Sequence, residues 1–207
     1  MSERGQLILV SAPSGAGKTS LVQAALQQDA TVAVSVSHTT RPQRANEQDG
    51  VNYHFVDDTR FRQMIDAGEF LEHAVVFGNL YGTSRSEIEQ LNAAGRDVIL
   101  EIDWQGAAQV RNILPHAKSI FILPPSIDTL QQRLHDRGQD DADTIRRRLG
   151  EAQLDMSQAA DYDYIVINDD FDVALRAFTA ILQAGRCEAS RLLAHSNRVQ
   201  ALVQSER

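Results

Sequence analysis

Short apolar segments alternate with longer segments of helical periodicity over most of the chain. The apolar segments are rich in β-branched residues and predict five strands, near 6–11, 32–36, 97–102, 118–123 and 163–167. The segments between them predict helices near 18–28, 84–94, 105–113, 126–136, 142–159 and 171–194. Strands that alternate with helices indicate an α/β protein, in which a parallel sheet is covered by helices on both faces.

The alternation is interrupted between residues 37 and 83. This stretch has short strand-like segments, turns and one brief helical segment near 58–66. We therefore expect one domain over 1–207, with a small mixed α/β subdomain at about 37–83 inserted into the core. The core is then made of about 1–36, 84–130 and 155–207.

The first predicted strand runs directly into a glycine-rich turn that opens a helix. The turn and the start of the helix consist of Ala12, Pro13, Ser14, Gly15, Ala16, Gly17, Lys18 and Thr19. A strand, a glycine-rich turn and a helix N-terminus together direct backbone N–H groups at one anion, which predicts a P-loop for a nucleotide phosphate. Lys18 can reach the β- and γ-phosphates, and the hydroxyl of Thr19 suits Mg²⁺. The usual pattern begins with glycine, whereas this chain has Ala12 there.

Composition limits the class of partner. The chain has 207 residues and a formal net charge of −8, which argues against binding a nucleic acid polymer through a basic surface. The chain has no run of about 18 apolar residues, so the sequence predicts no membrane span. The N-terminus has no apolar signal-peptide core. The single cysteine, Cys187, is typical of a reducing cytoplasm. Arginines are nevertheless grouped at 41–44 and 133–148, which suits small phosphate ligands.

Several further motifs give the chain a family resemblance. They are Ser37–Arg44, Gly50–Phe55, Glu69–Glu72, Gly78–Thr83, Glu101–Gly106, Ile122–Ser126, Arg133–Gly138 and Ile167–Asp170. In this order, from residue 5 to about 190, they resemble guanylate kinase. The resemblance implies a P-loop NTPase-type core and a helical lid at about 131–154. It also implies that ATP phosphorylates GMP, and also dGMP, with Mg²⁺ bound to ATP.

The resemblance also assigns roles to individual residues. The positions matched to GMP binding are Ser37, Arg41, Arg44, Tyr53, Glu72, Tyr81, Thr83, Glu101 and Asp103. The positions matched to catalysis are Lys18, Arg41 and three lid arginines, Arg133, Arg137 and Arg148. Asn168 is matched to a position near the adenine of ATP, and Thr19 and Asp103 are matched to Mg²⁺.

The chemistry of phosphoryl transfer agrees with these assignments. The phosphate of a nucleoside monophosphate is mostly a dianion at neutral pH, so it needs no general base. The reaction instead needs positive charge between the phosphates of the two nucleotides, and the planar guanidinium group of arginine can bond to two phosphate oxygens at once. Guanine presents N1–H and an amino group side by side, and one carboxylate, Glu72, can accept from both. Ser37 and Thr83 are the matched hydroxyl partners.

Two acidic residues near the end of the third core strand leave alternatives open. Asp103 can organise Mg²⁺ through water and can also face the base. Glu101 stands where the family pattern usually has aspartate, and strand alternation puts both acids on one face. Glu101 either bends to contact the guanine amino group or reaches the base through water.

Two other functions fit parts of the pattern. Guanylate-kinase-like domains also serve as non-catalytic protein-binding modules, and a related kinase acts on a phosphorylated ribose. The first usually departs from the phosphate loop, and the second would lose the guanine-reading residues. The sequence keeps both sets. It does not fix the oligomeric state, and the amphipathic stretch at 186–207 fits either a packing helix or a subunit contact.

Overall fold

The computed structural model describes residues 4–136 and 142–204. A five-stranded sheet in the order β2-β7-β1-β8-β9 lies at its centre, and all neighbouring strands are parallel. The strands are β1 (Leu7–Ser11), β2 (Val32–Val34), β7 (Asp97–Glu101), β8 (Lys118–Leu123) and β9 (Tyr164–Ile167). The predicted strands and their parallel arrangement are confirmed.

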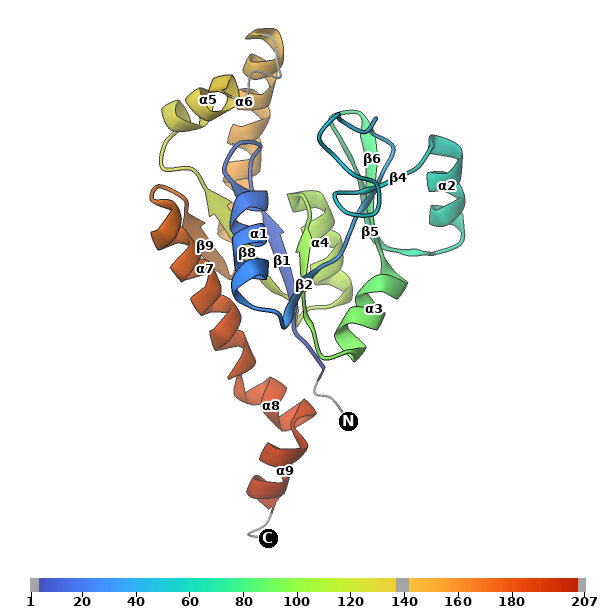
Figure 1. The fold of residues 1–207 in the computed structure, drawn as a ribbon, viewed down its shortest axis with the longest axis vertical. Helices are drawn as coiled ribbons and strands as arrows, with labels where there is room; N and C mark the ends of the chain where they lie inside the picture. Colours follow the sequence, from blue (N-terminus) through green and yellow to red (C-terminus); the bar gives the residue numbers. More distant parts are fainter. Residues whose placement is uncertain (1–3, 137–141, 205–207) are drawn as a thin grey trace.

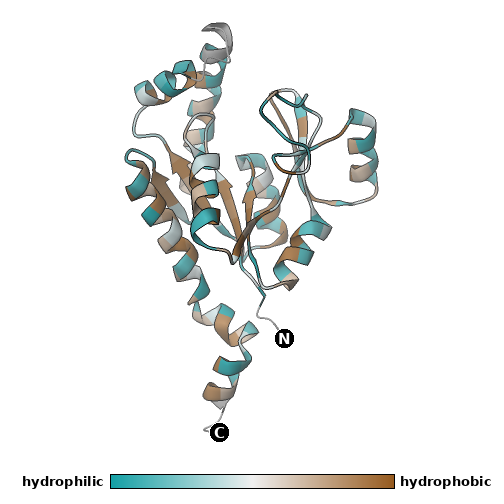
Figure 2. Ribbon diagram, in the orientation of Figure 1, coloured by the Kyte–Doolittle hydropathy of each residue, from teal (hydrophilic) through white to brown (hydrophobic). Residues whose placement is uncertain are grey.

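Helices cover both faces of this sheet (Figure 1). On one face lie α1 (Lys18–Gln28) and α7 (Phe171–Arg186), and on the other lie α3 (Arg85–Ala93) and α4 (Trp104–Ile113). α5 (Ile127–Asp136) and α6 (Ala142–Ser157) pack on each other beyond the carboxyl ends of the strands. Side chains alternate along a strand, so Ile8 and Val10 pack with residues of α1 and α7. Leu9 and Leu100 pack with residues of α3 and α4. The strands are accordingly the most hydrophobic elements of the core (Figure 2).

The predicted helix over 171–194 is wrong at its C-terminal end. α7 ends at Arg186, and α8 (Ala189–His195) and α9 (Asn197–Gln204) follow as separate short helices that lead away from the sheet (Figure 1). The end of α7 is fixed by tertiary contacts, because Arg186 bonds to Asp97 at 2.5 Å and to Asp29 at 2.7 Å. The long helix predicted near 142–159 ends as α-helix at Ser157 and continues as a 3₁₀ turn (Gln158–Asp161).

A second, four-stranded mixed sheet is formed by the residues between β2 and α3. Its order is β4-β3-β6-β5, with β3 (His38–Thr39), β4 (His54–Phe55), β5 (Phe70–Val76) and β6 (Asn79–Ser84). α2 (Asp58–Asp66), which the sequence predicts, packs on this sheet through its own small apolar cluster. β5 is an edge strand, paired only with β6 among the described strands.

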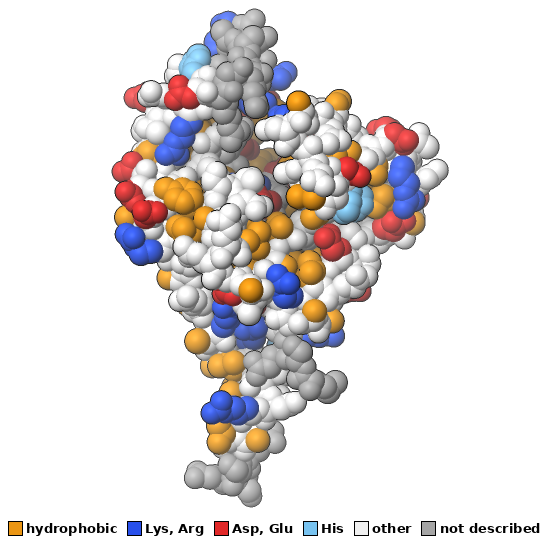
Figure 3. Space-filling model, viewed as in Figure 1, with side chains coloured by type: hydrophobic (Ala, Val, Ile, Leu, Met, Phe, Trp, Pro, Cys, Tyr) orange, Lys and Arg blue, Asp and Glu red, His pale blue; other side chains and the backbone are white. Residues whose placement is uncertain are grey.

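The topology brings the predicted site to one end of the central sheet. β1 leads into the glycine-rich turn at its carboxyl end, and β7 leads at the same end into Asp103. In parallel α/β sheets, ligands bind at the carboxyl ends of the strands. The mixed sheet lies beside this end, and the surface is hollowed between it and the side formed by α5 and α6 (Figure 3).

Candidate active site

The glycine-rich turn has the backbone that a phosphate-binding loop requires. Gly15 and Gly17 have φ values of 92° and 93°, in the left-handed region that favours glycine. Gly17 is also the N-cap of α1, so the first N–H groups of the helix face the turn. Asn168 follows β9, and its side-chain amide donates to the carbonyl of Ala16 at 2.7 Å. Asn168 therefore ties the end of β9 to the loop.

Lys18 reaches from this loop towards the end of β7. Its Nζ donates to the carbonyl of Ile102 at 3.4 Å, and burial lowers the pKa of the Lys18 ammonium below its usual range. Four carboxylates act on the pKa of Lys18 in the opposite direction, namely those of Glu101, Asp103, Asp155 and Glu72. The loop lysine and the predicted base-reading acid thus belong to one electrostatic cluster.

Thr19 and the two acids near the end of β7 offer hard oxygen ligands. The Thr19 hydroxyl donates to Glu101 Oε2 at 2.9 Å. Asp103 caps α4, because its Oδ1 accepts from the N–H of Gly106 at 2.9 Å. Mg²⁺ prefers hydroxyl, carboxylate and water oxygens, so this donor set fits it. The carboxylate of Glu101 lies on the Thr19 side of the cluster.

Glu72 lies on β5 of the mixed sheet and is almost completely buried. It is 4 % exposed, and its Oε1 accepts from the hydroxyl of Thr83, on β6, at 2.5 Å. Burial raises the pKa of Glu72 to about 7, and the nearby carboxylate of Asp103 adds to this. Ser37 is half-buried and directly precedes β3 in the same sheet. A buried carboxylate with a hydroxyl partner is suited to read two adjacent N–H donors.

The predicted phosphate-binding residues of the mixed sheet also lie together. The Arg41 guanidinium lies over the ring of Tyr53 at 5.4 Å, and the Tyr53 and Tyr81 rings are 5.8 Å apart. Glu47 bonds to the Arg41 guanidinium at 2.7 Å and accepts from the backbone N–H of Arg44 at 2.8 Å. Glu47 is not among the residues predicted from the sequence, although its spacing of three residues from Arg44 is a common ion-pair spacing.

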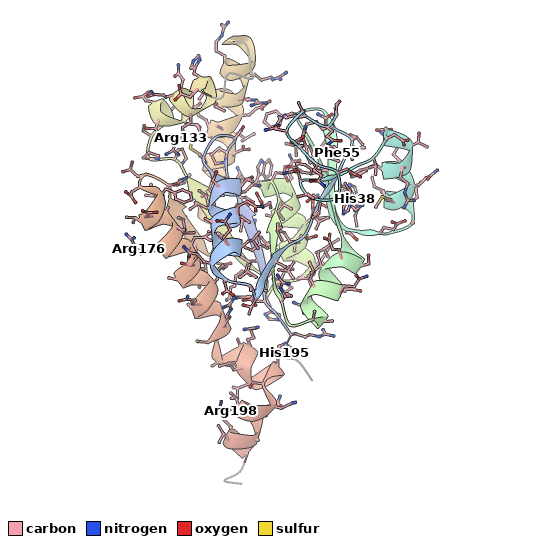
Figure 4. The ribbon with its side chains drawn as sticks, in the orientation of Figure 1. His38, Phe55, Arg133, Arg176, His195 and Arg198 are labelled. Carbon is pink, nitrogen blue, oxygen red and sulfur yellow. The ribbon has the colours of Figure 1, made fainter. Side chains whose placement is uncertain are left out.

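Two of the arginines that the sequence predicts in a lid, Arg133 and Arg148, lie on α5 and α6. Arg133 donates to the carbonyl of Asn168 at 3.0 Å. Figure 4 labels Arg133 on the α5 side, and His38 and Phe55 in the mixed sheet opposite. The Arg148 guanidinium lies 5.8 Å from the ring centroid of Phe77, at the turn between β5 and β6. Arg148 therefore meets the mixed sheet across the site, whereas Arg137 lies outside the described residues.

Asp155 is a further member of the site that sequence reasoning missed. It lies on α6 and accepts a hydrogen bond from the side chain of Trp104. Burial raises the pKa of Asp155 to about 6, and the carboxylates of Asp103 and Glu151 add to this. The sequence gives no signal for it, because its hydrogen bond with Trp104 joins two helices that are far apart in the chain.

Two cavities are relevant to the position of the nucleotides. One of about 410 Å³ lies against the loop and is lined by Gly17, Arg133, Asn168 and Phe171 among others. A larger one of about 800 Å³ lies at the amino ends of the strands, between the N-terminal segment and α8, and none of the predicted site residues lines it. The smaller cavity therefore lies where the sequence predicts the ATP site.

Comparison with known proteins tests the family resemblance. The family model described as guanylate kinase matches residues 4–185. The chain belongs to the guanylate kinase family. It is 59 % identical over 187 residues to the guanylate kinase of Hahella chejuensis, covering 90 % of each chain. It is 55 % identical over 203 residues to that of Vibrio cholerae, covering 97 % of this chain and 98 % of the relative.

Solved structures confirm the fold. The crystal structure of guanylate kinase from Anaplasma phagocytophilum matches with a TM-score of 0.78 and 34 % identity, over 92 % of this chain and 90 % of that one. The predicted guanylate kinase resemblance and α/β fold class are therefore confirmed. Within the described residues, no helix is both long and apolar enough to cross a membrane.

Proposed function

We propose that this guanylate kinase transfers the γ-phosphoryl group of ATP directly to GMP or dGMP, giving ADP and GDP or dGDP. The enzymatic activity follows from family membership. One observation carries the assignment of the site: the P-loop lysine, Lys18, and the buried carboxylate, Glu72, share one electrostatic cluster. Phosphate-binding and base-reading groups thus lie at a single centre.

Arginines and tyrosines of the mixed sheet bind the GMP phosphate in this proposal. Arg41 and Arg44 supply positive charge, and the hydroxyls of Tyr53 and Tyr81 donate hydrogen bonds. Glu47 orients the two arginines before GMP arrives, because it already bonds to the Arg41 side chain and the Arg44 backbone. The GMP phosphate attacks as a dianion, so no side chain has to remove a proton.

Glu72 selects the base. Its carboxylate accepts from N1–H and the amino group of guanine, while Thr83 and Ser37 supply hydroxyls to the base. Adenine presents an acceptor in place of N1–H and would leave the buried carboxylate unpaired, which is costly. A contact of Glu101 with the guanine amino group stays a prediction, because its carboxylate accepts a hydrogen bond from Thr19.

The loop and the lid bind ATP. The backbone of Ala12, Pro13, Ser14, Gly15, Ala16, Gly17 and Lys18 cradles the phosphates, and Asn168 lies near the adenine. Lys18, Arg133 and Arg148 stabilise the charge that spreads over the transferred group, as does Arg137, which lies outside the described residues. Thr19 and Asp103 would hold Mg²⁺, directly or through water, with Glu101 beside them. When bound, Mg²⁺ neutralises phosphate charge.

The chain divides, in this proposal, into a core, a GMP-binding subdomain at about 37–83 and a lid at about 131–154. Closure of the subdomain and the lid over both substrates excludes water and so suppresses ATP hydrolysis. The enzyme acts in the cytoplasm, which suits a chain whose one cysteine, Cys187, is free and exposed. It acts on mononucleotides and not on nucleic acid polymers or membranes.

A nucleotide panel tests this proposal. ADP formation is followed with ATP and, in turn, GMP, dGMP, AMP, CMP, UMP or a ribose phosphate as acceptor. We expect turnover with GMP and dGMP to exceed that with every other acceptor by at least about 100-fold. Preference for a ribose phosphate would identify the related kinase, and no turnover with any acceptor would identify a binding module. Either result would overturn the proposal.

A further inference from the structure

The strand that carries Glu72 is weakly supported by its own sheet. β5 is an edge strand, so β6 holds it on one side only. Its register with β6 also shifts between Phe70 and Glu72, which marks a β-bulge or irregularity directly before the base-reading acid. Bulges interrupt the ladder and redirect side chains. The orientation of Glu72 therefore needs a support that β6 alone does not give.

The open edge of β5 is held at the next residue by a side chain of α4. Gln109 Oε1 accepts from the N–H of His73 at 3.3 Å, and Gln109 Nε2 donates to the carbonyl of His73 at 2.8 Å. The amide of Gln109 thus bonds to both backbone groups of His73, as a neighbouring strand would. This fixes the backbone one residue after Glu72.

The same helix also limits where the Glu72 carboxylate can lie. Gly106 is buried, three residues before Gln109 on α4, so the two share one helix face. A Cβ on Gly106 would lie 2.5 Å from Glu72 Oε2 and 3.1 Å from its Cδ. The carboxylate of Glu72 therefore rests directly against the backbone of α4, in space that only glycine leaves open.

From these contacts we infer that Gln109 and Gly106 are positioning residues for guanine selection. Gln109 fixes the position of the β5 backbone at His73, and Gly106 fixes how closely the Glu72 carboxylate approaches α4. Both residues act on guanine through Glu72. The inference rests on the proposed role of Glu72 in reading the base. It also explains why α4, which belongs to the central sheet, packs closely on β5 of the mixed sheet.

The test compares GMP with IMP, which keeps N1–H but lacks the amino group. Gln109→Met removes both hydrogen bonds while keeping the length and the helix preference of the side chain. We expect it to raise the KM for GMP about tenfold and to lower the GMP-to-IMP ratio of kcat/KM about fivefold, since small misplacements cost this much. The KM for ATP should change less than about twofold.

Gly106→Ala separates positioning from stability. Alanine is the better helix former, and the cheapest relief of its close contact is a shift of the Glu72 carboxylate. We expect the GMP-to-IMP ratio to fall at least about fivefold while Tm stays level or rises. Asn112→Ala, at an exposed position of the same helix, is the matched control. It gains the same kind of helix preference, so Tm should again stay level or rise, but the GMP-to-IMP ratio should not change.

The outcomes distinguish this inference from the proposed function. Equal losses for GMP and IMP in both α4 variants, or a lower Tm with an unchanged ratio, would overturn the positioning role. If Glu72→Gln itself leaves the ratio unchanged, the base-reading role of Glu72 fails instead. If both hold, adding Gln109→Met to Glu72→Gln should lower the ratio no further, because the two changes act through one group.

Discussion

The ionisation of Glu72 should make GMP binding depend on pH. Burial raises the pKa of this carboxyl group to about 7. Guanine offers two N–H donors, which only the ionised carboxylate can accept together. GMP therefore binds the ionised fraction of the enzyme, and its apparent affinity should fall as the pH drops below the pKa.

The size of the effect follows from the ionised fraction. With a pKa of about 7, roughly nine-tenths of Glu72 is ionised at about pH 8 and roughly one-tenth at about pH 6. Apparent affinity scales with the competent fraction, so the KM for GMP should rise about tenfold over this range. The KM for ATP, which does not contact Glu72 in this account, should rise much less.

Steady-state rates at saturating ATP across this range give the KM for GMP at each pH. The GMP phosphate also loses charge near about pH 6, so the control is Glu72→Gln, in which only the phosphate titrates. We expect the profile of the variant to be flatter than that of the wild type below about pH 7. Parallel profiles would show that Glu72 is ionised throughout or does not contact the base.

The raised pKa of Glu72 should make the stability of the protein fall as the pH rises, whereas the affinity for GMP should increase. The folded state binds a proton more tightly than the unfolded chain, whose carboxyl group has the usual pKa of 4.5. Stability is therefore full below the unfolded pKa and is lost as pH rises from about 4.5 to about 7. Glu72→Gln should raise the free energy of unfolding by on the order of 1 kcal/mol at about pH 8, measured by denaturant titration without ligand. A less stable variant would contradict this reasoning.

Three further variants test the remaining roles. Lys18→Met should lower kcat on the order of 10²-fold, with a smaller effect on GMP binding. Near-normal turnover of the folded variant would contradict the role of Lys18 in stabilising the transferred phosphoryl group. Arg44→Met should raise the KM for GMP far more than that for ATP, and equal changes would assign Arg44 to the ATP side or to stability. Glu101→Ala should lower kcat/KM for GMP more than for IMP, because IMP lacks the amino group that Glu101 is predicted to contact. Equal losses for the two nucleotides would assign Glu101 to the Mg²⁺ side, where it bonds to Thr19.

Local patterns were enough to predict much of the fold and the phosphate loop. The five strands and α2 were predicted because apolar runs and helical periodicity are properties of neighbouring residues. The glycines of the loop were recognisable because Gly15 and Gly17 serve backbone conformations that other residues rarely adopt. The end of α7 was not predicted, since it depends on the pairing of Arg186 with Asp97, 89 residues away.

The supports of the site were also out of reach of the sequence. Gln109 and Asp155 are polar residues on ordinary-looking helices, and each acquires its role from a partner on another element. Gln109 meets His73 from 36 residues away. The family resemblance predicted Glu72 and Thr83 as site residues, but it did not predict the contacts from α4 that position Glu72.

The central claim is that one buried carboxylate, Glu72, reads guanine beside the phosphate-transfer centre. A crystal structure of the enzyme with GMP tests it most directly. The account predicts that the two carboxylate oxygens of Glu72 lie about 3 Å from N1 and the amino nitrogen of guanine. GMP bound with N1 and the amino group on another residue, and with Glu72 still bonded only to Thr83, would contradict it.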